Sequence, residues 1–234
     1  SQGPPAQGSG VAPSSPLPLC HVENWIFDLD NTLYPPGSEI LRVAEGRIRR
    51  FIQDRFGLDP DEAHRLQKAC LHEDGSTLAG RIRRFRIDPE PYLAFVNDVD
   101  VTTLPPVPAL REGLARLPGK RVVFTNNCAF YTERVLNQLG IADMFHAVCD
   151  IRVIGFAAKP ARSGYETVLA RAGVPAAKSA MFEDSERNLA PAHALGMTTV
   201  WYAPGANPQL PPHVHHSTHD LVQFLHAIEV TPTP

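Results

Sequence analysis

Residues 25–35 read Trp-Ile-Phe-Asp-Leu-Asp-Asn-Thr-Leu-Tyr-Pro, and this stretch decides the fold class of the chain. It opens with an apolar run of aromatic and β-branched residues, which is typical of a buried strand. Alternation along that strand puts Asp28 and Asp30 on the same side, at the carboxyl end, where open α/β sheets bind their ligands. Two carboxylates about 4 Å apart repel by roughly 4 kcal/mol at an effective dielectric constant of about 20. We therefore expect cationic groups beside them.

Further apolar runs predict a sheet around this strand. The predicted strands are residues 25–29, 121–125, 180–183 and 198–202, with a weaker one at 147–149. Helical patterns lie between them. Residues 163–172 show Ser163 and Glu166 as a capping box and a glycine directly after the last turn, and helices are also expected at 188–195 and 221–228. Alternating strands and helices predict an α/β fold, a Rossmann-like parallel sheet with helices on both faces.

The segment after the first strand has a different pattern. Residues 37–104 contain no strand-like run, and their apolar residues recur at helical spacing. We predict an all-helical cap that leaves the ligand edge of the sheet and covers it as a lid. Residues 20–36 and 105–234 then form the α/β core. Residues 1–19 are rich in Pro, Gly, Ser and Gln and carry no charge, which predicts a disordered leader.

The composition limits the possible partners. The 234 residues are 43% hydrophobic and 20% charged, with a formal net charge of −3, and no apolar run approaches the roughly 18 residues of a membrane span. We expect neither a membrane nor a nucleic acid polymer as partner. Four arginines within residues 81–86 are interpreted as a solvated helix face or an anion-steering patch. Four widely spaced cysteines suggest neither a zinc site nor disulfides and fit a cytoplasmic protein. The pattern indicates no particular oligomeric state.

Three downstream segments supply groups that would compensate the two carboxylates. They lie at the ends of predicted strands or the starts of helices: Thr125-Asn126-Asn127, Lys159 before a proline, and Glu183-Asp184-Ser185 with Asn188 a turn later. A hydroxyl and backbone N–H groups can hold phosphate oxygens, lysine brings positive charge, and acidic side chains are the hard ligands that Mg²⁺ prefers. Taken singly, each segment is more often an ordinary cap or loop. Together, and in this order, they predict a phosphoryl-transfer site.

The set predicts a Mg²⁺-dependent phosphatase acting on a small phosphorylated metabolite. Asp28 would attack the phosphorus in line and form an aspartyl-phosphate, while Mg²⁺ and Lys159 offset the charge of the phosphate. Asp30 would protonate the leaving alcohol and then activate the hydrolytic water. We expect the carboxylates of Asp28, Asp30 and Asp184 to converge with the Lys159 amine around one cation and phosphoryl pocket.

Residues 27–35, together with the downstream segments, resemble the haloacid dehalogenase superfamily of aspartate-nucleophile phosphatases, and most of residues 22–204 match its pattern. The extended signature is similar to the pyrimidine 5'-nucleotidase branch, which dephosphorylates nucleoside monophosphates such as UMP and CMP. The resemblance implies a Rossmann-like sheet with a helical cap after the first strand. It also implies roles for single residues: Asp28 as nucleophile, Asp30 as acid/base and as a metal ligand through its backbone carbonyl, Thr125 and Asn126 as phosphate holders, Lys159 as charge stabiliser, and Asp184 as the acidic metal ligand.

Around these positions the resemblance gives further expectations. Glu183 stands where the superfamily often has Gly or Asp, so it would lie behind the metal ligands, with Ser185 and Asn188, or reach the metal through water. The cap run Tyr-Gly-Thr-Thr-Leu of the branch appears as residues 74–78, Asp-Gly-Ser-Thr-Leu. Gly75, Ser76 and Thr77 are accordingly expected at the substrate, with an acid in place of a ring that would stack on a base.

The same residues and fold are also compatible with other functions. The same fold could serve another small phosphate ester, such as a sugar phosphate or phosphoglycolate, or a catalytically silent module that binds a metabolite. A dehalogenase would also use an aspartate nucleophile, but it needs neither the acid/base Asp30 nor the metal ligand Asp184. A histidine cluster within residues 213–219 is interpreted as a solvated loop, with zinc or nickel binding as the alternative.

Overall fold

Strand β1 (Asn24–Phe27) lies inside a parallel sheet, and all four of its residues are buried. The computed structural model describes residues 19–75, 77–204 and 209–230, which leaves the predicted leader almost wholly outside the described residues. In this part of the chain the sheet has six strands in the order β3-β2-β1-β4-β5-β6, and every pairing is parallel. The other strands are β2 (Lys120–Phe124), β3 (Ala147–Cys149), β4 (Ser179–Glu183), β5 (Thr198–Tyr202) and β6 (His216–Thr218).

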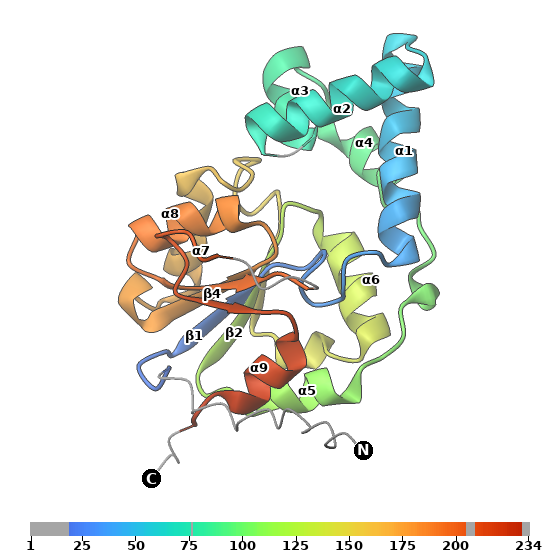
Figure 1. Ribbon diagram of the computed structural model, residues 1–234. Helices are drawn as coiled ribbons and strands as arrows, with labels where there is room; N and C mark the ends of the chain where they lie inside the picture. Colours follow the sequence, from blue (N-terminus) through green and yellow to red (C-terminus); the bar gives the residue numbers. More distant parts are fainter. Residues whose placement is uncertain (1–18, 76, 205–208, 231–234) are drawn as a thin grey trace, which may run out of the picture.

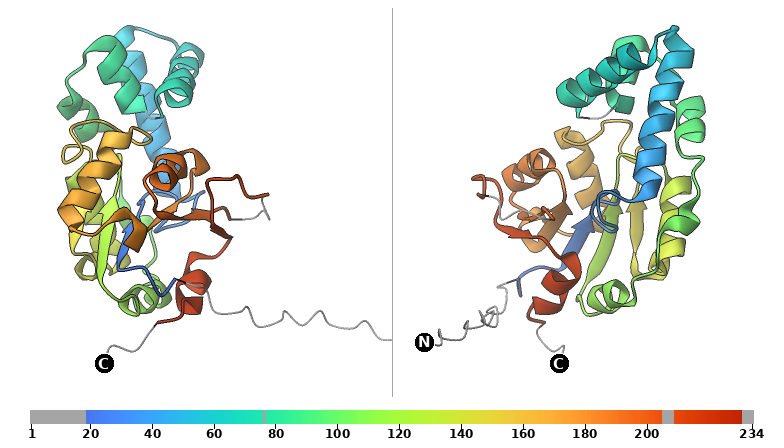
Figure 2. Two further views of the ribbon diagram at one scale, coloured as in Figure 1. Left: turned by 90° about the vertical axis from the view of Figure 1, so that its left-hand side faces the viewer. Right: turned by 45° about the vertical axis from the view of Figure 1, so that its right-hand side comes forward.

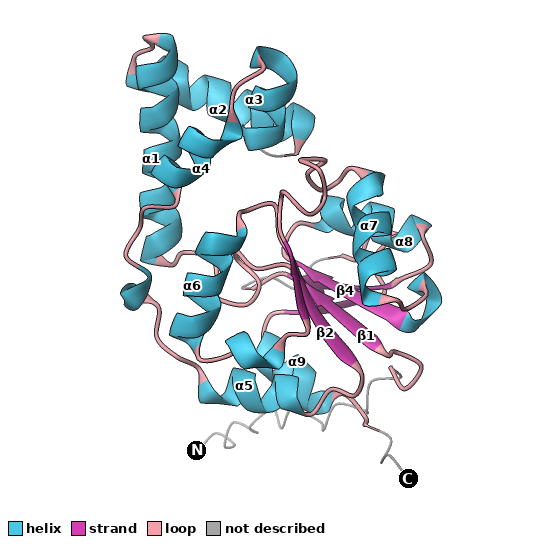
Figure 3. Cartoon of the chain, turned by 180° about the vertical axis from the view of Figure 1, so that it is seen from behind, coloured by secondary structure: helices cyan, strands magenta, loops and turns pink. Residues whose placement is uncertain are grey.

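Helices flank both faces of the sheet, which confirms the predicted fold class (Figures 1 and 3). Figure 3 shows α7 (Arg162–Ala172) and α8 (Leu189–Ala194) on one side of the sheet. On the other side lie α5 (Pro108–Ala115), α6 (Ala129–Leu139) and α9 (Leu221–Ala227). Because the central strands are covered on both faces, they consist of continuous apolar runs rather than alternating ones.

The described part of the predicted cap segment, which follows β1 and precedes α5, is helical, as its periodicity predicts. It forms α1 (Glu39–Phe56), α2 (Pro60–Asp74), α3 (Thr77–Phe85) and α4 (Pro89–Val96), which stand over one end of the sheet in Figures 1 and 2. Local signals explain the boundary between the first two: Gly57 ends α1 with φ 64°, and Asp59 and Glu62 form a complete capping box ahead of α2. The cap boundaries 37 and 104 themselves stay a prediction.

Two local predictions were wrong. Ser163 and Glu166 form no capping box, because α7 already begins at Arg162, whose Nε donates to the Glu166 carboxylate at 2.8 Å. The histidine-rich segment is not a loop throughout, since His216 starts β6, a strand of three residues too short to show a period. Its neighbours have structural partners: the Thr199 backbone N–H donates to His215 Nδ1 at 3.0 Å.

Within the described ranges, none of the helices is both long and apolar enough to cross a membrane. All four cysteines are free thiols.

Candidate active site

The carboxyl ends of β1, β2 and β4 meet because these strands are neighbours in register. Phe27 lies opposite Val123 on one side and Phe182 on the other. The residues that follow these strands therefore share one edge of the sheet, although they are far apart in the chain. Asp28 continues the pairing, since its backbone N–H donates to the Phe182 carbonyl at 3.0 Å.

Lys159 is the centre of the polar contacts at this edge. Its side chain is 1% exposed, and its ammonium donates to Asp28 Oδ1 at 2.8 Å, to Glu183 Oε2 at 2.9 Å and to the Phe124 carbonyl at 2.8 Å. Three hydrogen bonds use all the donors of an ammonium group. Burial works against the charged form, but the nearby carboxylates of Asp28 and Glu183 outweigh it, so the pKa of Lys159 is raised. The group therefore stays cationic.

The loop that carries Lys159 is held by the segment after β2. The Asn126 carbonyl oxygen Oδ1 accepts from the Lys159 backbone N–H at 2.8 Å, and Asn126 Nδ2 donates to the Lys159 carbonyl at 3.3 Å. Thr125 is buried, and its hydroxyl accepts from the Asn127 backbone N–H at 3.0 Å. Asn126 thus positions the lysine, a contact that the sequence does not reveal. Its predicted role and that of Thr125 in holding phosphate stay predictions.

Three carboxylates gather beside the lysine. Asp28, Glu183 and Asp184 each place an oxygen within 4.8 Å of the others. Burial and then the charge of Asp28 raise the pKa of Glu183 well above its usual range and that of Asp184 to about 7. Burial would also raise the pKa of Asp28, but the Lys159 ammonium lowers it overall. Asp28 is therefore the carboxylate held in its anionic form.

This donor set fits a divalent cation. The buried carboxyl groups of Asp28 and Glu183 share one ammonium, and the half-buried carboxyl group of Asp184 lies beside them, so a hard cation would compensate the negative charge of the group when it is ionised. Asp28 and Asp184 are brought together as predicted, and Glu183 joins them as well as binding Lys159. The Asp30 carboxylate is not among these three, because it accepts from two tyrosines; its predicted place at the same cation and phosphoryl pocket stays a prediction. Ser185 donates its backbone N–H to Glu183 Oε1 at 3.4 Å, and the Asn188 carbonyl accepts from Tyr165 at 2.5 Å.

Asp30 is bound by two phenols. Tyr34 and Tyr131 both donate to its Oδ1, Tyr131 at 2.9 Å, and the two hydroxyl oxygens lie 2.9 Å apart. Burial is the largest influence on Asp30, and together with the charge of Asp28 it raises the pKa to about 6, although Tyr34 and Tyr131 oppose the rise. A carboxyl group with this pKa exchanges a proton near neutral pH, as an acid/base must.

Replacing Tyr131 with phenylalanine tests this arrangement. The change removes one donor to the Asp30 carboxylate, so the pKa of Asp30 should rise above about 6. If Asp30 acts as an acid, kcat/KM falls as pH rises through that pKa. We expect the fall to move upward by about half a pH unit in the variant, the scale of one lost hydrogen bond. The Tyr202→Phe variant should match the wild type, and a fall that stays in place or moves downward would contradict the assignment.

A cavity of about 220 Å³ lies between Asp30 and the helical insertion. The core lines it with Asn126, Asn127 and Tyr131, and the insertion lines it mainly with apolar side chains from α1, α3 and α4. Thr77 lies in this lining as predicted, whereas Ser76 falls outside the described residues. Gly75 does not line the cavity; it packs on the Lys159 loop, where a Cβ would overlap the Pro160 ring and approach the Lys159 carbonyl to 2.9 Å.

Two cavity residues on α4 and at its end were missed by sequence reasoning. Asn97, the residue that ends α4, exchanges two hydrogen bonds with Asn127, at 2.7 and 2.9 Å, and so ties the insertion to the floor of the cavity. Tyr92 supplies an aromatic ring to the lining. Asp74 occupies the position at which the cap run of the branch has a tyrosine. It forms ion pairs with Arg83 and Arg84. A period of 3.6 shows that Tyr92 is on a helix face but not which cavity that face meets.

Known proteins match this chain in sequence and in fold. The family model of haloacid dehalogenase-like hydrolases matches residues 24–196. Phosphate metabolism protein 8 of Saccharomyces cerevisiae is 31% identical over 208 residues, 80% of this chain and 64% of that protein, so the chain spans less than two thirds of this relative.

Solved structures show the same fold at low identity. A HAD phosphatase from Thermococcus onnurineus has a TM-score of 0.60 at 20% identity, covering 86% of this chain and 95% of that one. The magnesium-bound HAD hydrolase YfnB of Bacillus subtilis has a TM-score of 0.58 at 15% identity, covering 88% and 97%. A 2-haloacid dehalogenase from Pseudomonas syringae has a TM-score of 0.57 at 19% identity, covering 88% and 97%. With the family model matching well over half of its residues, this chain belongs to the haloacid dehalogenase-like hydrolases.

Proposed function

We propose that this protein is a Mg²⁺-dependent phosphatase that removes phosphate from nucleoside 5'-monophosphates, with pyrimidine nucleotides as the preferred class. One observation carries the proposal. The carboxylate of Asp28 is kept anionic by Lys159 and lies beside Glu183 and Asp184, while Asp30, two residues on, has a pKa of about 6. A nucleophile, a cation site and an acid/base thus occupy one edge of the sheet.

The chain's own residues would divide the reaction as follows. Asp28 attacks the phosphorus, and the bond to the leaving oxygen breaks as the aspartyl-phosphate forms. Asp30 gives its proton to that oxygen, then removes a proton from the water that attacks the phosphorus of the intermediate and releases Asp28. Lys159 stays cationic beside Asp28 throughout and offsets phosphate charge. Mg²⁺, held by Asp28, Asp184 and the Asp30 backbone carbonyl, would neutralise the phosphoryl oxygens.

The cavity supports a leaving group that is flat and uncharged. Among the described residues that line it there is no lysine or arginine, and Glu45 adds a carboxylate at the rim. A second anionic group, as in phosphoglycolate, would be repelled there. Apolar walls, the ring of Tyr92 and the amides of Asn97 and Asn127 suit a heterocycle with polar edges. The name of the yeast relative, a phosphate metabolism protein, agrees with phosphate chemistry.

Dehalogenation is the second candidate, because 2-haloacid dehalogenases share this fold. Halide needs no proton to leave, and a haloacid has no phosphate dianion to neutralise. In a dehalogenase, the raised pKa of Asp30 and the group of carboxylates around Asp184 would then have no role in the reaction. These two features favour the phosphatase.

Turnover of p-nitrophenyl phosphate with Mg²⁺ and with EDTA tests the reaction class. We expect phosphate release with Mg²⁺ and none with EDTA. A comparison of UMP and CMP with sugar phosphates and phosphoglycolate then tests the substrate class, and the pyrimidine nucleotides should give the highest kcat/KM. Metal-independent halide release from 2-chloropropionate would support the dehalogenase, and no turnover of any ester would support a silent binding module.

Asp184→Ala tests the cation site. Removing one oxygen donor should raise the Mg²⁺ concentration for half-maximal turnover by roughly 100-fold or more, since even a residue behind the ligands is worth 10- to 100-fold. Asp61→Ala, an exposed acid in the first turn of α2, is the matched control and should leave the titration unchanged. An unaltered Mg²⁺ titration in Asp184→Ala would exclude this carboxylate as a ligand.

A further inference from the structure

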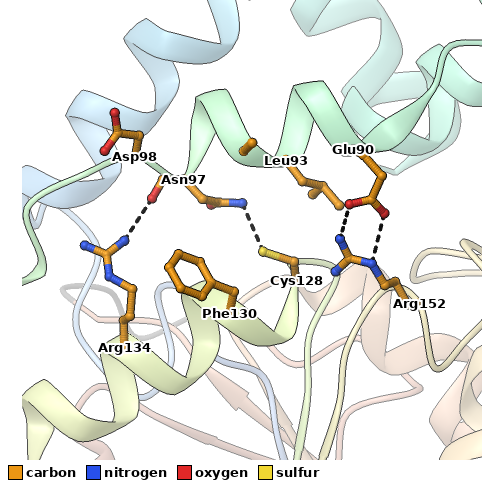
Figure 4. A pocket seen from close by; sticks show the side chains of 9 residues that line it. Glu90, Leu93, Asn97, Asp98, Cys128, Phe130, Arg134 and Arg152 are labelled. Atoms are coloured by element: carbon orange, nitrogen blue, oxygen red, sulfur yellow. Dashed lines mark hydrogen bonds and ion pairs between the residues drawn. The ribbon is translucent and has the colours of Figure 1, made fainter.

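A second cavity lies on the outside of α4, facing the first turns of α6 (Figure 4). Its volume is about 420 Å³, within the range of small-molecule sites. Asn97 and Leu93 line both this cavity and the catalytic one, so α4 forms a wall between them. We call this second cavity the outer pocket; nothing in the proposed reaction uses it.

An exposed phenyl ring stands in the outer pocket. Phe130, the second residue of α6, is 68% exposed, the highest value among the large exposed hydrophobic side chains of the described residues. In Figure 4 its ring points from α6 toward α4, where Leu93 lies on the opposite side of the pocket. A ring left in water at the mouth of a pocket gives up favourable burial unless something covers it. Its free face suits a flat ring stacked on it.

Arg134 brings a positive charge to the same pocket. Its guanidinium donates to the carbonyl oxygens of Asn97 at 3.1 Å and Val99 at 2.7 Å, and lies 5.6 Å from the centre of the Phe130 ring. Carbonyl oxygens fix its position but do not neutralise it. Within the described ranges, no carboxylate forms an ion pair with Arg134.

The other charged side chains that line the pocket form ion pairs. Arg152 binds Glu90 through two hydrogen bonds of 3.0 and 2.5 Å, as Figure 4 shows. Asp98 pairs with Arg47 at 3.6 Å. Arg134 is thus the charged side chain of the pocket that forms no ion pair among the described residues, and it lies next to an aromatic face. After the hydrogen bonds from Thr102, its charge also contributes to the lowered pKa of exposed Asp100.

We propose that the outer pocket binds a planar aromatic molecule that carries one negative charge, with its ring stacked on Phe130 and its anionic group at Arg134. The carboxylate, sulfonate or phosphate of such a ligand would find in Arg134 a planar, fixed donor of the kind that recognises these groups. Leu93 closes the apolar side of the pocket over the ring. The site is separate from the catalytic centre and does not depend on the phosphatase assignment.

Binding of 1-naphthalenesulfonate to the full chain, followed by the anisotropy of the probe's own fluorescence, tests this site. We expect saturable binding, weakened about fivefold or more in Phe130→Ala, the lower end of what stacking on an aromatic side chain contributes. Phe130→Tyr should restore it. Phe85→Ala, which removes an exposed ring elsewhere on the cap, is the matched control. If Arg134 binds the negative charge of the sulfonate, the neutral 1-naphthalenesulfonamide should bind about tenfold more weakly to the wild type.

Several results would overturn the site. These are no binding to the wild type, equal affinity of wild type and Phe130→Ala, or equal affinity for the sulfonate and the sulfonamide. Turnover and thermal unfolding of Phe130→Ala should match the wild type, which shows that lost binding is local. Arg134→Gln is a weaker test, because Arg134 also holds two backbone carbonyls.

Discussion

Replacing Asp28 with asparagine should reduce phosphate release by roughly 10⁴-fold or more, the scale seen when an enzyme loses its nucleophile. Asparagine keeps the size of the side chain and one oxygen, which can accept from Lys159 in place of Oδ1, while its NH2 group takes the place of Oδ2, the acceptor of the Thr32 hydroxyl. It has no anionic oxygen to attack phosphorus. The measurement is steady-state phosphate release from UMP and p-nitrophenyl phosphate at saturating Mg²⁺.

The fold should tolerate this change. The negative charge of Asp28 is one cause of the raised pKa values of Glu183 and Asp184, so removing it relieves repulsion inside a buried group. We expect the midpoint of thermal unfolding to stay the same or to rise. Asp54→Asn, at an exposed acid paired with Arg50, should keep full activity. A variant at position 28 with wild-type turnover would refute the nucleophile assignment.

Replacing Lys159 with glutamine should abolish turnover and also destabilise the protein by about 3–5 kcal/mol, the cost of breaking a buried ion pair from one side. The ammonium is the shared partner of Asp28 and Glu183, and the side chains of Lys159 and Glu183 are each only 1% exposed. Without it both carboxylates remain in a buried site with no cation. Urea unfolding followed by circular dichroism measures the loss.

The loss should depend on pH in a defined direction. Lys159 lowers the pKa of Glu183, so its removal raises that pKa further. A carboxyl group whose pKa is raised by folding costs stability when it is ionised, and this cost vanishes as the pH falls and the group takes up its proton. The destabilisation should therefore be larger at pH 8 than at pH 5. Lys178→Gln, which breaks the exposed pair with Glu23, should cost no more than about 1 kcal/mol at either pH.

The sequence predicted the strands better than the details at their ends. The apolar runs at 25–29, 121–125 and 198–202 correspond to β1, β2 and β5, because a strand buried on both faces must be apolar throughout. β6 was missed, since its three half-buried residues leave no period to detect. The capping box at Ser163 was wrong because the ion pair of Arg162 with Glu166 competes for the same carboxylate.

The same contrast holds in the candidate site. Asp28, Lys159 and Asp184 were expected together because the ends of parallel strands meet at one edge, and in the structure they lie together there. The contact of Asn126 with the Lys159 backbone, the pair of Asn97 with Asn127, and the phenols around Asp30 were not expected. Tyr131 lies 101 residues from Asp30 in the chain, and no local pattern connects them.

By itself, the sequence determined the α/β class, the helical insertion after the first strand and the chemical groups that stand at the strand ends. These follow from short-range periodicity and from residue type, which are properties of neighbouring positions. Only the tertiary structure decided which side chains come into contact. Asp30 accepts hydrogen bonds from two tyrosines, and Glu183 lies with Asp28 and Asp184. Phe130 and Arg134 line one pocket outside α4. Such contacts depend on how whole elements pack, because side chains from distant segments meet only once the sheet and the cap have formed.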